Sequence, residues 1–406
     1  MERVSKMTDK DRQQKLVKEF KKIYGTGDAK KIRCFSSPGR LELSGNHTDH
    51  QGGVVLTGTA DLDIIACVSE NNTDRIEIFS KGYDPVSVDC KDKDIYPEEK
   101  NKTAALVRGM LKSISDKGYE IKGFDMYAES DLPAGLGMSS SACFEVLVGT
   151  VMNELFCDGK LSKEDIAYCA VYAENEYFGK PCGLMDQMAC LTGGINLFDF
   201  RDPDKPLIEN ISFDFKAAGL DIVVTDTGTH HADMAEEFNA IPEEMFSVAN
   251  ALGGARLCDI DESVFYRELP ELRKTTGDRA VLRALHWYDE TKRVRNEKKA
   301  LEENDTQKFT ELVRACGRSS FMYLQNIDNY KDSKYQPVAI ALAAADHMLS
   351  GRGAVRIQGG GFAGSIIAFV PEDMTPDFIK KMDRFLKEGA CRRVSIRECG
   401  VYEISI

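Results

Sequence analysis

A glycine- and serine-rich turn, LPAGLGMSSSA at 132–142, lies between a strand-like run, FDMYAES at 124–130, and a helical pattern at 141–156. Gly135 and Gly137 let backbone amides approach an anion closely, and the serines add hydroxyl donors. The helix that follows directs its positive end toward the same point. The turn therefore predicts a phosphate cradle in a mixed α and β fold, although such a turn can also do no more than cap a helix. The G-x-x-x-x-G-K-[ST] spacing of a Walker A loop is missing.

A second segment, GRLELSGNHTDHQGG at 39–53, concentrates arginine, asparagine, histidine, aspartate and glutamine in one turn-rich stretch. This density of hydrogen-bonding groups suits a polyhydroxylated ligand, because each hydroxyl both donates and accepts. A polar surface turn without a ligand is the alternative when the segment is taken alone. His47 and His50 also suggest a metal, but no partnering cysteine pair accompanies them, so zinc is not favoured.

A third segment, FGKPCGLMDQ at 178–187, places Asp186 among apolar neighbours, downstream of a helical pattern that carries Glu174 and Glu176. A carboxylate in this setting suits a general base, and an upstream glutamate suits a cation ligand. Taken alone, a single acid after a helix is more typical of a surface or capping residue.

The glycine run GGGFAG at 359–364 fits G-x-G-x-x-G and follows a strand-like run. A dinucleotide site needs a helix directly after these glycines, whereas SIIAFV at 365–370 is strand-like. A nicotinamide cofactor is therefore not expected.

Composition limits the partners. The chain has 406 residues, more than twice the size of a typical domain, so two domains are expected. The formal charge of -13 argues against nucleic acid as a partner and favours a small molecule. The 12 cysteines include no C-x-x-C pair and indicate reduced, packed thiols. With no signal-like or membrane-spanning run, we expect a soluble cytoplasmic protein.

The C-terminal part shows the clearest order of elements. A helical pattern at 337–350 precedes a strand-like run at 354–358, the glycine run, a strand at 365–370, a helix at 376–388 and closing strand material at 392–406. This order fits a split βαβ unit, with helices packed on one face of a sheet. Long helical patterns at 279–303 and 306–325 precede it. We expect domains at 1–215 and 216–406.

With these segments in this order, the chain resembles the GHMP kinases and, within them, the galactokinases. The segment at 39–53 is similar to the galactokinase signature, and the segment at 132–142 is similar to the ATP phosphate loop. RIQGGGFAGS at 356–365 is similar to the motif that closes over that loop. The segment at 178–187 is similar to the one that carries the catalytic aspartate. The resemblance implies an α+β fold of two domains, the first like ribosomal protein S5 domain 2 and the second ferredoxin-like, with the active site between them. It implies a cytoplasmic ATP-dependent sugar kinase, using Mg²⁺, that is a monomer or weak dimer.

The resemblance also implies residue roles. Asp186 would be the catalytic base, and Arg40 would stabilise the ionised sugar hydroxyl and the transferring phosphoryl group. Ser141 and Glu174 would hold magnesium. The remaining expected contacts are to ATP (Gly135, Gly137, Ser139, Ser140 and Ser141) and to the sugar (Asn46, His47, Asp49, Gly183 and Phe238).

Two positions depart from the galactokinase pattern. Galactokinases normally carry glutamate where this chain has Asn46, and usually tyrosine where it has Phe238. Both changes remove acceptors or charge from the sugar pocket, and the Asn46 amide could donate to a sugar carboxylate. The resemblance makes galactose the expected substrate, and these departures raise galacturonic acid as the alternative. A non-catalytic sugar sensor is a second alternative, but such proteins typically have a damaged phosphate loop, and this one is intact.

Overall fold

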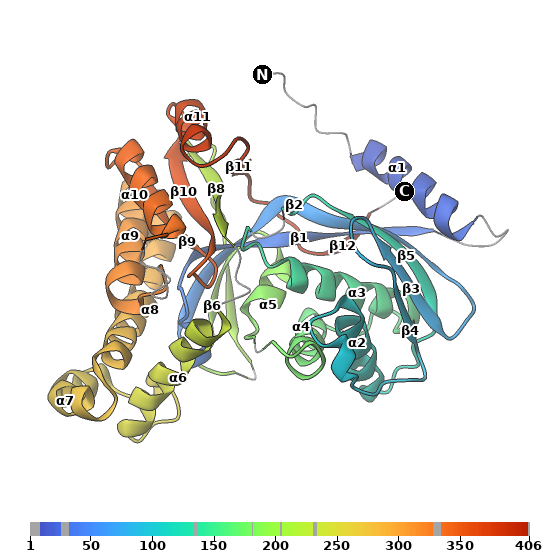
Figure 1. The fold of residues 1–406 in the computed structure, drawn as a ribbon, viewed down its shortest axis with the longest axis horizontal. Helices are drawn as coiled ribbons and strands as arrows, with labels where there is room; N and C mark the ends of the chain where they lie inside the picture. Colours follow the sequence, from blue (N-terminus) through green and yellow to red (C-terminus); the bar gives the residue numbers. More distant parts are fainter. Residues whose placement is uncertain are drawn as a thin grey trace.

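The computed structural model describes residues 9–25, 32–133, 136–180, 182–203, 205–229, 234–327 and 334–404. These residues form two β-sheets with helices around them (Figure 1). We expect a domain boundary at 215/216. It falls between β7, which belongs to the first sheet, and β8, which is the first strand of the second sheet. The C-terminal strand β12 nevertheless returns to the first sheet, and the division into domains at this boundary stays a prediction.

The first sheet has eight strands among the described residues, and its longest path runs β12-β1-β2-β5-β3-β4, with β6 paired to β2 and β7 paired to β6. Helices α2 to α5 lie on one face, and α1 lies on the opposite face (Figure 1). Leu16 and Phe20 of α1 pack in one apolar cluster with buried side chains of β1 and β2. Because helices cover both faces, strands β1 and β2 are buried almost throughout and do not alternate between apolar and polar residues.

The strands of the first sheet are β1 (Arg33–Ser44), β2 (Val54–Glu70), β3 (Arg75–Ser80), β4 (Val86–Asp89), β5 (Phe124–Ser130), β6 (Ile195–Asp199), β7 (Leu207–Ile211) and β12 (Tyr402–Ile404). Its helices are α1 (Asp9–Tyr24), α2 (Thr103–Asp116), α3 (Ser140–Phe156), α4 (Lys163–Tyr172) and α5 (Met185–Thr192), with 3₁₀ turns at Asp49–Gln51 and Pro97–Glu99 and a π-helical turn at Ala173–Phe178.

The second sheet has four antiparallel strands in the order β11-β8-β10-β9. Numbered by their place in the chain, this order is 4-1-3-2, and α11 connects the third strand to the fourth. It confirms the split βαβ arrangement expected from the order of elements at the C-terminus. Its elements are β8 (Leu220–Thr229), α10 (Pro337–Leu349), β9 (Ala354–Gln358), β10 (Gly364–Pro371), α11 (Thr375–Phe385) and β11 (Cys391–Val394).

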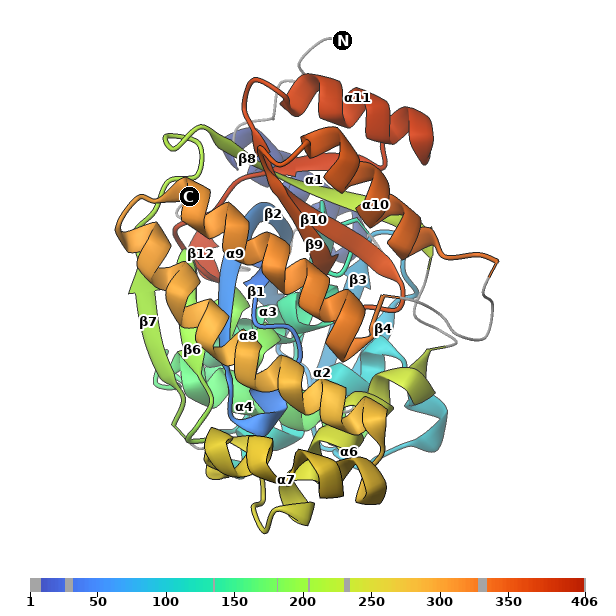
Figure 2. The same ribbon diagram turned by 90° about the vertical axis from the view of Figure 1, so that its left-hand side faces the viewer.

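Among the described residues between β8 and α10, the chain forms four α-helices: α6 (Ala235–Ala251), α7 (Glu262–Thr275), α8 (Asp278–Glu302) and α9 (Thr306–Ser319), with a 3₁₀ turn at Leu257–Asp259 and a π-helical turn at Ser320–Leu324. Helices α8 and α9 run side by side across the molecule (Figure 2). Helix α8 contacts β2 of the first sheet, and α9 contacts β9 of the second. The two sheets are therefore joined by this helical layer as well as by the chain.

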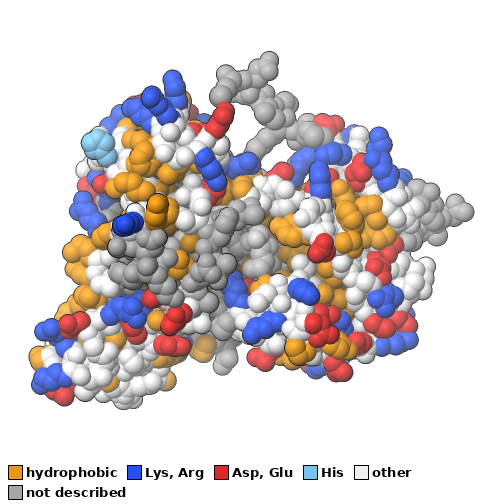
Figure 3. Space-filling view, viewed as in Figure 1, with side chains coloured by type: hydrophobic (Ala, Val, Ile, Leu, Met, Phe, Trp, Pro, Cys, Tyr) orange, Lys and Arg blue, Asp and Glu red, His pale blue; other side chains and the backbone are white. Residues whose placement is uncertain are grey.

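Side chains of both charges share the surface of the molecule. On the face shown in Figure 3, Lys and Arg side chains are interspersed with Asp and Glu side chains and form no broad basic area. Within the described residues, no helix combines the length and apolar character needed to cross a bilayer.

Candidate active site

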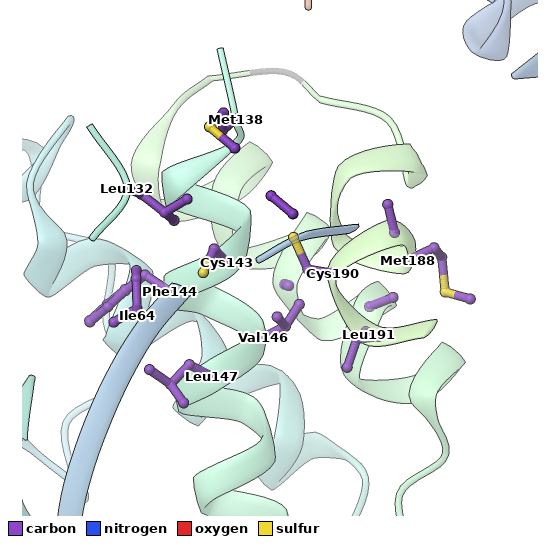
Figure 4. Close-up of a cluster of buried hydrophobic side chains, with 14 of the residues drawn as sticks. Ile64, Leu132, Met138, Cys143, Phe144, Val146, Leu147, Met188, Cys190 and Leu191 are labelled. Atoms are coloured by element: carbon purple, nitrogen blue, oxygen red, sulfur yellow. The ribbon is translucent and has the colours of Figure 1, made fainter. Parts of the chain in front are cut away.

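The phosphate loop, defined here as residues 132–139, connects β5 to α3, as its sequence predicts. Gly137 has φ +59° and Ser139 has φ +55°, so both adopt the left-handed backbone conformation that favours glycine. Leu132 and Met138 are buried in the apolar core that α3 and α5 form beneath the loop (Figure 4). This core fixes the loop at the N-terminal end of α3. Gly135, a predicted phosphate contact, lies outside the described residues.

The hydrogen bonds to the phosphate loop use its carbonyl groups. Ser365 Oγ donates to the Leu136 carbonyl at 2.6 Å, and Arg40 Nη1 donates to the Gly137 carbonyl at 3.1 Å. The Arg40 amide donates to the Met138 carbonyl at 3.0 Å. Among the described residues, the amide groups of Gly137, Met138 and Ser139 have no hydrogen-bond acceptor. They remain available to an anion, as a phosphate cradle requires.

Arg40 reaches this loop because β1 departs from regular pairing at that point. The register between β1 and β2 shifts between Pro38 and Arg40, where proline lacks the N–H that a regular ladder needs. A bulge of this kind redirects the side chains that follow it. The Arg40 guanidinium is 5% exposed and lies within hydrogen-bond distance of Asp186 Oδ1, at 2.8 Å from Nε and 2.7 Å from Nη2.

Asp186 lies in the first turn of α5 and is the more accessible partner, with 30% of its side chain exposed. Burial alone would raise the pKa of Asp186, but the charge of Arg40 and hydrogen bonds from Ser139 and Arg40 hold it below its usual range. The carboxylate is therefore ionised at neutral pH. The structure brings the two predicted catalytic residues together, beside Ser139 of the phosphate loop.

A second carboxylate cluster lies at the start of α3. Ser141 Oγ donates to Glu174 Oε1 at 3.2 Å, and Lys180 Nζ lies 3.1 Å from the same oxygen. Gln187 Nε2 donates to Glu174 Oε2 at 3.0 Å and to Glu145 Oε2 at 3.2 Å. Burial and the neighbouring charge of Glu174 raise the pKa of Glu145 well above its usual range.

The predicted magnesium ligands Ser141 and Glu174 are thus in contact, and their oxygens are of the type that magnesium prefers. Among the described residues, Glu145 Oε1 is buried and has no hydrogen-bond partner, so the cluster has one unused carboxyl oxygen. These residues fit a site in which the protein supplies few ligands and substrate phosphates supply the rest. Glu145 was not predicted, although its place four residues after Ser141 puts both on one face of α3.

The loop at residues 45–53, called the signature loop below, carries three of the predicted sugar contacts. His47 has φ +56°, and its Nε2 donates to the Gly360 carbonyl at 2.8 Å. Burial raises the pKa of Asp49 to about 6, and the charges of Asp186 and Glu42 act in the same direction. A Cβ atom on Gly183 would lie 2.7 Å from Asp49 Oδ2, so glycine is what allows this approach. His50 has no partner for either ring nitrogen among the described residues.

Asn46 is 1% exposed, and internal partners engage its amide group. Its Nδ2 donates to Glu42 Oε1 at 2.7 Å and to the Gly359 carbonyl at 2.8 Å, while its Oδ1 accepts from Asn326 Nδ2 at 2.6 Å. Glu42 also accepts from Arg356 Nη2 at 2.7 Å. The expectation that this amide is free to donate to a sugar carboxylate is therefore not met. The sequence did not reveal Glu42, which keeps a carboxylate beside Asn46.

Phe238, in the first turns of α6, lies against the signature loop, with its ring centroid 5.2 Å from that of His47. A Cβ atom on Gly360 would lie 2.0 Å from the Phe238 ring, so this glycine permits the contact. The glycine run at 359–361 consequently connects Phe238, His47 and Asn46. Asn46, His47 and Phe238 thus meet at this run, and Gly183 lies against Asp49 of the signature loop.

A cavity of about 470 Å³ opens on the other side of the phosphate loop. Apolar side chains, including Leu106, Phe144 and Phe178, form much of its lining, and Ser140 and Ser141 lie at its edge. No motif had indicated this cavity, because its lining comes from segments spread over 64–178.

The chain matches two family models: "GHMP kinases N terminal domain" over residues 105–194 and "Galactokinase galactose-binding signature" over residues 18–70. It is 30% identical to the galactokinase of Clostridium tetani over 379 residues, which cover 90% of each chain, and 30% identical to that of Streptomyces coelicolor over 358 residues, which cover 86% of this chain and 87% of the relative. Among solved structures, it superposes on Lactococcus lactis galactokinase complexed with galactose with a TM-score of 0.83, at 22% identity, over 97% of this chain and 100% of that chain.

A structure of mevalonate kinase, at 14% identity, matches with a TM-score of 0.64 over 90% of this chain and 99% of that one. The fold and the site therefore define a GHMP kinase, with the α+β architecture expected from the sequence. Within that class the chain belongs to the galactokinase family, and it is an ATP-dependent phosphotransferase. The comparisons favour neither the galacturonic acid alternative nor the non-catalytic sensor.

Proposed function

We propose that the enzyme transfers the γ-phosphoryl group of ATP to the anomeric hydroxyl of D-galactose and releases ADP and galactose 1-phosphate. The observation that carries this proposal is the Arg40–Asp186 pair, which lies between the phosphate loop and the residues expected to contact the sugar. The galactokinase relatives and the match to the galactose-binding signature support galactose as the acceptor.

In this proposal Asp186 accepts the proton of the anomeric hydroxyl while that oxygen bonds to the γ-phosphorus. The bond from phosphorus to the bridging oxygen breaks, and ADP leaves. Arg40 keeps Asp186 ionised and offsets negative charge on the transferring group. A carboxylate with a lowered pKa is a modest base, but phosphoryl transfer depends mainly on alignment and charge neutralisation.

Ser141 and Glu174 would hold magnesium, and Glu145 lies close enough to share Gln187 with Glu174. When bound, the ion would neutralise charge on the outer phosphates of ATP. The free amides of Gly137, Met138 and Ser139 would receive the phosphates, with the hydroxyls of Ser140 and Ser141 beside them. The adjoining apolar cavity would receive the adenine base, since its lining includes Phe144 and Phe178.

On the sugar side, Asn46, His47, Asp49, Gly183 and Phe238 would surround the acceptor. Glu42 and Asp49 bring negative charge to this side of the site. Glu42 accepts a hydrogen bond from Asn46, and the charge of Asp186 acts on Asp49. Such a pocket suits a neutral sugar better than a sugar acid, because a second carboxylate would be repelled.

We place the reaction in the cytoplasm and expect a monomer or weak dimer. All twelve cysteines are free in the structure, and eight of them are buried, which supports a reducing compartment.

The test is ADP release from ATP and magnesium with D-galactose, D-galacturonic acid and N-acetylgalactosamine at equal concentrations. We expect the highest kcat/KM with galactose. A higher value with galacturonic acid would make the sugar acid the substrate. Binding of galactose and ATP without any ADP release would instead assign the protein to the non-catalytic sensors.

A further inference from the structure

Helix α8 contacts the signature loop through three hydrogen bonds to the loop backbone. His286 Nε2 donates to the Asn46 carbonyl at 2.9 Å, and Trp287 Nε1 donates to the Thr48 carbonyl at 3.0 Å. The Gly45 amide donates to Glu290 Oε1 at 3.0 Å. The helix therefore binds the loop at residues 45, 46 and 48, more than 230 positions away in the sequence.

The three α8 residues are spaced i, i+1 and i+4, so they belong to one side of the helix. Each is buried, with exposed fractions of 0% for His286 and Glu290 and 4% for Trp287. In this dry setting their hydrogen bonds do not compete with water, and an unpaired member would be costly. The contact is therefore a specific attachment and more than apolar packing.

The attachment surrounds a strained residue. His47, between the bonded residues 46 and 48, has φ +56°, a conformation that a residue with a side chain rarely adopts. Such a conformation persists only where neighbouring contacts enforce it. The bonds from α8 on both sides of His47, together with its own bond to Gly360, supply that enforcement.

The hydrogen-bond partners of His286 also determine which ring nitrogen carries the proton. A carbonyl oxygen only accepts, so Nε2 carries the hydrogen, and Nδ1 accepts from Ser319 Oγ at 2.9 Å. Burial lowers the pKa of His286 to about 4, which keeps the ring neutral at physiological pH. Arg293 pairs with Glu290 Oε2, and the Cys316 thiol donates to Glu290 Oε1, the oxygen that also accepts from the Gly45 amide.

We infer that α8 positions the signature loop for the sugar, and that His286, Trp287 and Glu290 are positioning residues that set the orientation of His47 and Asp49. This inference rests on the proposed function, because it treats that loop as the sugar contact. None of the three α8 residues needs to touch the sugar.

The experiment compares His286→Leu with His286→Gln, because glutamine offers an N–H near the place of Nε2 and leucine does not. Val281→Ala is the matched control, since Val281 is a buried α8 residue in the apolar cluster with α6 and α7. For each protein we would measure the Kd for galactose with a saturating non-hydrolysable ATP analogue, the KM for galactose and for ATP, and thermal unfolding.

We expect His286→Leu to raise the Kd and KM for galactose about tenfold, the effect of losing one buried hydrogen bond, with the KM for ATP unchanged. His286→Gln should recover most of this loss, and Val281→Ala should lower the Tm without changing either KM. An unchanged Kd for galactose in His286→Leu, or an equal rise in both KM values, would overturn the inference.

Ser319→Ala, which removes only the partner of Nδ1, gives a milder second test if the leucine variant does not fold. It should weaken galactose binding selectively, and equal effects on both substrates would again overturn the inference. Wild-type turnover with galactose tests the proposed function separately.

Discussion

The two loops that meet near Arg40 and Asp186 are held in different ways. Buried side chains of α8 bind the signature loop at the Gly45 amide and at the carbonyls of Asn46 and Thr48. The phosphate loop is held through the carbonyls of Leu136, Gly137 and Met138, while three of its described amides remain free. A loop that binds hydroxyls through side chains can use its backbone for support. A loop that binds an anion through its backbone must keep its amides unoccupied.

The largest expected effect lies at the junction of the two loops. Asp186→Asn removes the proposed base and leaves both loop attachments in place, so we expect kcat to fall by about 10²–10⁴ with little change in either KM. Steady-state kinetics with galactose and ATP would measure this change. Thermal unfolding provides the control, and near-normal turnover in a folded variant would show that another group takes the proton.

A smaller effect is expected on the sugar side alone. Asn46→Glu would put a second carboxylate beside Glu42, whose Oε1 now lies 2.7 Å from the Asn46 amide. Two such charges about 4 Å apart repel by about 4 kcal/mol at an effective dielectric of 20, and Arg356 offsets part of this. We expect the KM for galactose to rise about 30- to 100-fold, with the KM for ATP unchanged.

The double variant Glu42→Asn/Asn46→Glu restores a single carboxylate to this network and should recover most of the lost galactose affinity. A double-mutant cycle on the two positions would measure the coupling. Additive effects of the two changes would mean that the contact between Glu42 and Asn46 does not matter for the sugar.

The sequence predicted the parts of the site that depend on local segments. The phosphate loop, the glycine run and the order of the last strands could be read from turn residues and periodicity, because each is determined within about 15 residues. The helical pattern that carries Glu174 and Glu176 is helical in the structure, but it ends in a π-helical turn from Ala173 to Phe178, which periodicity does not distinguish from α-helix.

Contacts between distant segments could not be predicted in this way. Trp287 is buried, as a tryptophan in a helical pattern is expected to be, yet its Nε1 also donates to the Thr48 carbonyl. Glu145 lies in a helical pattern, and only the fold brings it beside Gln187, 42 residues away. Glu42 lies in the same segment as Asn46, but its partner Arg356 is 314 residues away, so the segment alone does not reveal the network.

The smallest effect is expected on the phosphate side. Gly137 has φ +59°, and a Cβ atom there would lie 2.9 Å from the Gln358 carbonyl oxygen. In Gly137→Ala the left-handed conformation costs about 1–2 kcal/mol, and the close contact displaces amides that the phosphates need. We expect the KM for ATP to rise about tenfold while the KM for galactose stays within about twofold.

Gly219→Ala is the matched control, because Gly219 has φ +76° but no atom within 4 Å of the added methyl group. It should lose similar stability and keep both KM values. If Gly137→Ala instead raised the KM for galactose as much as that for ATP, the two loops would be supported as one unit, and their different modes of attachment would have no separate consequence for the two substrates.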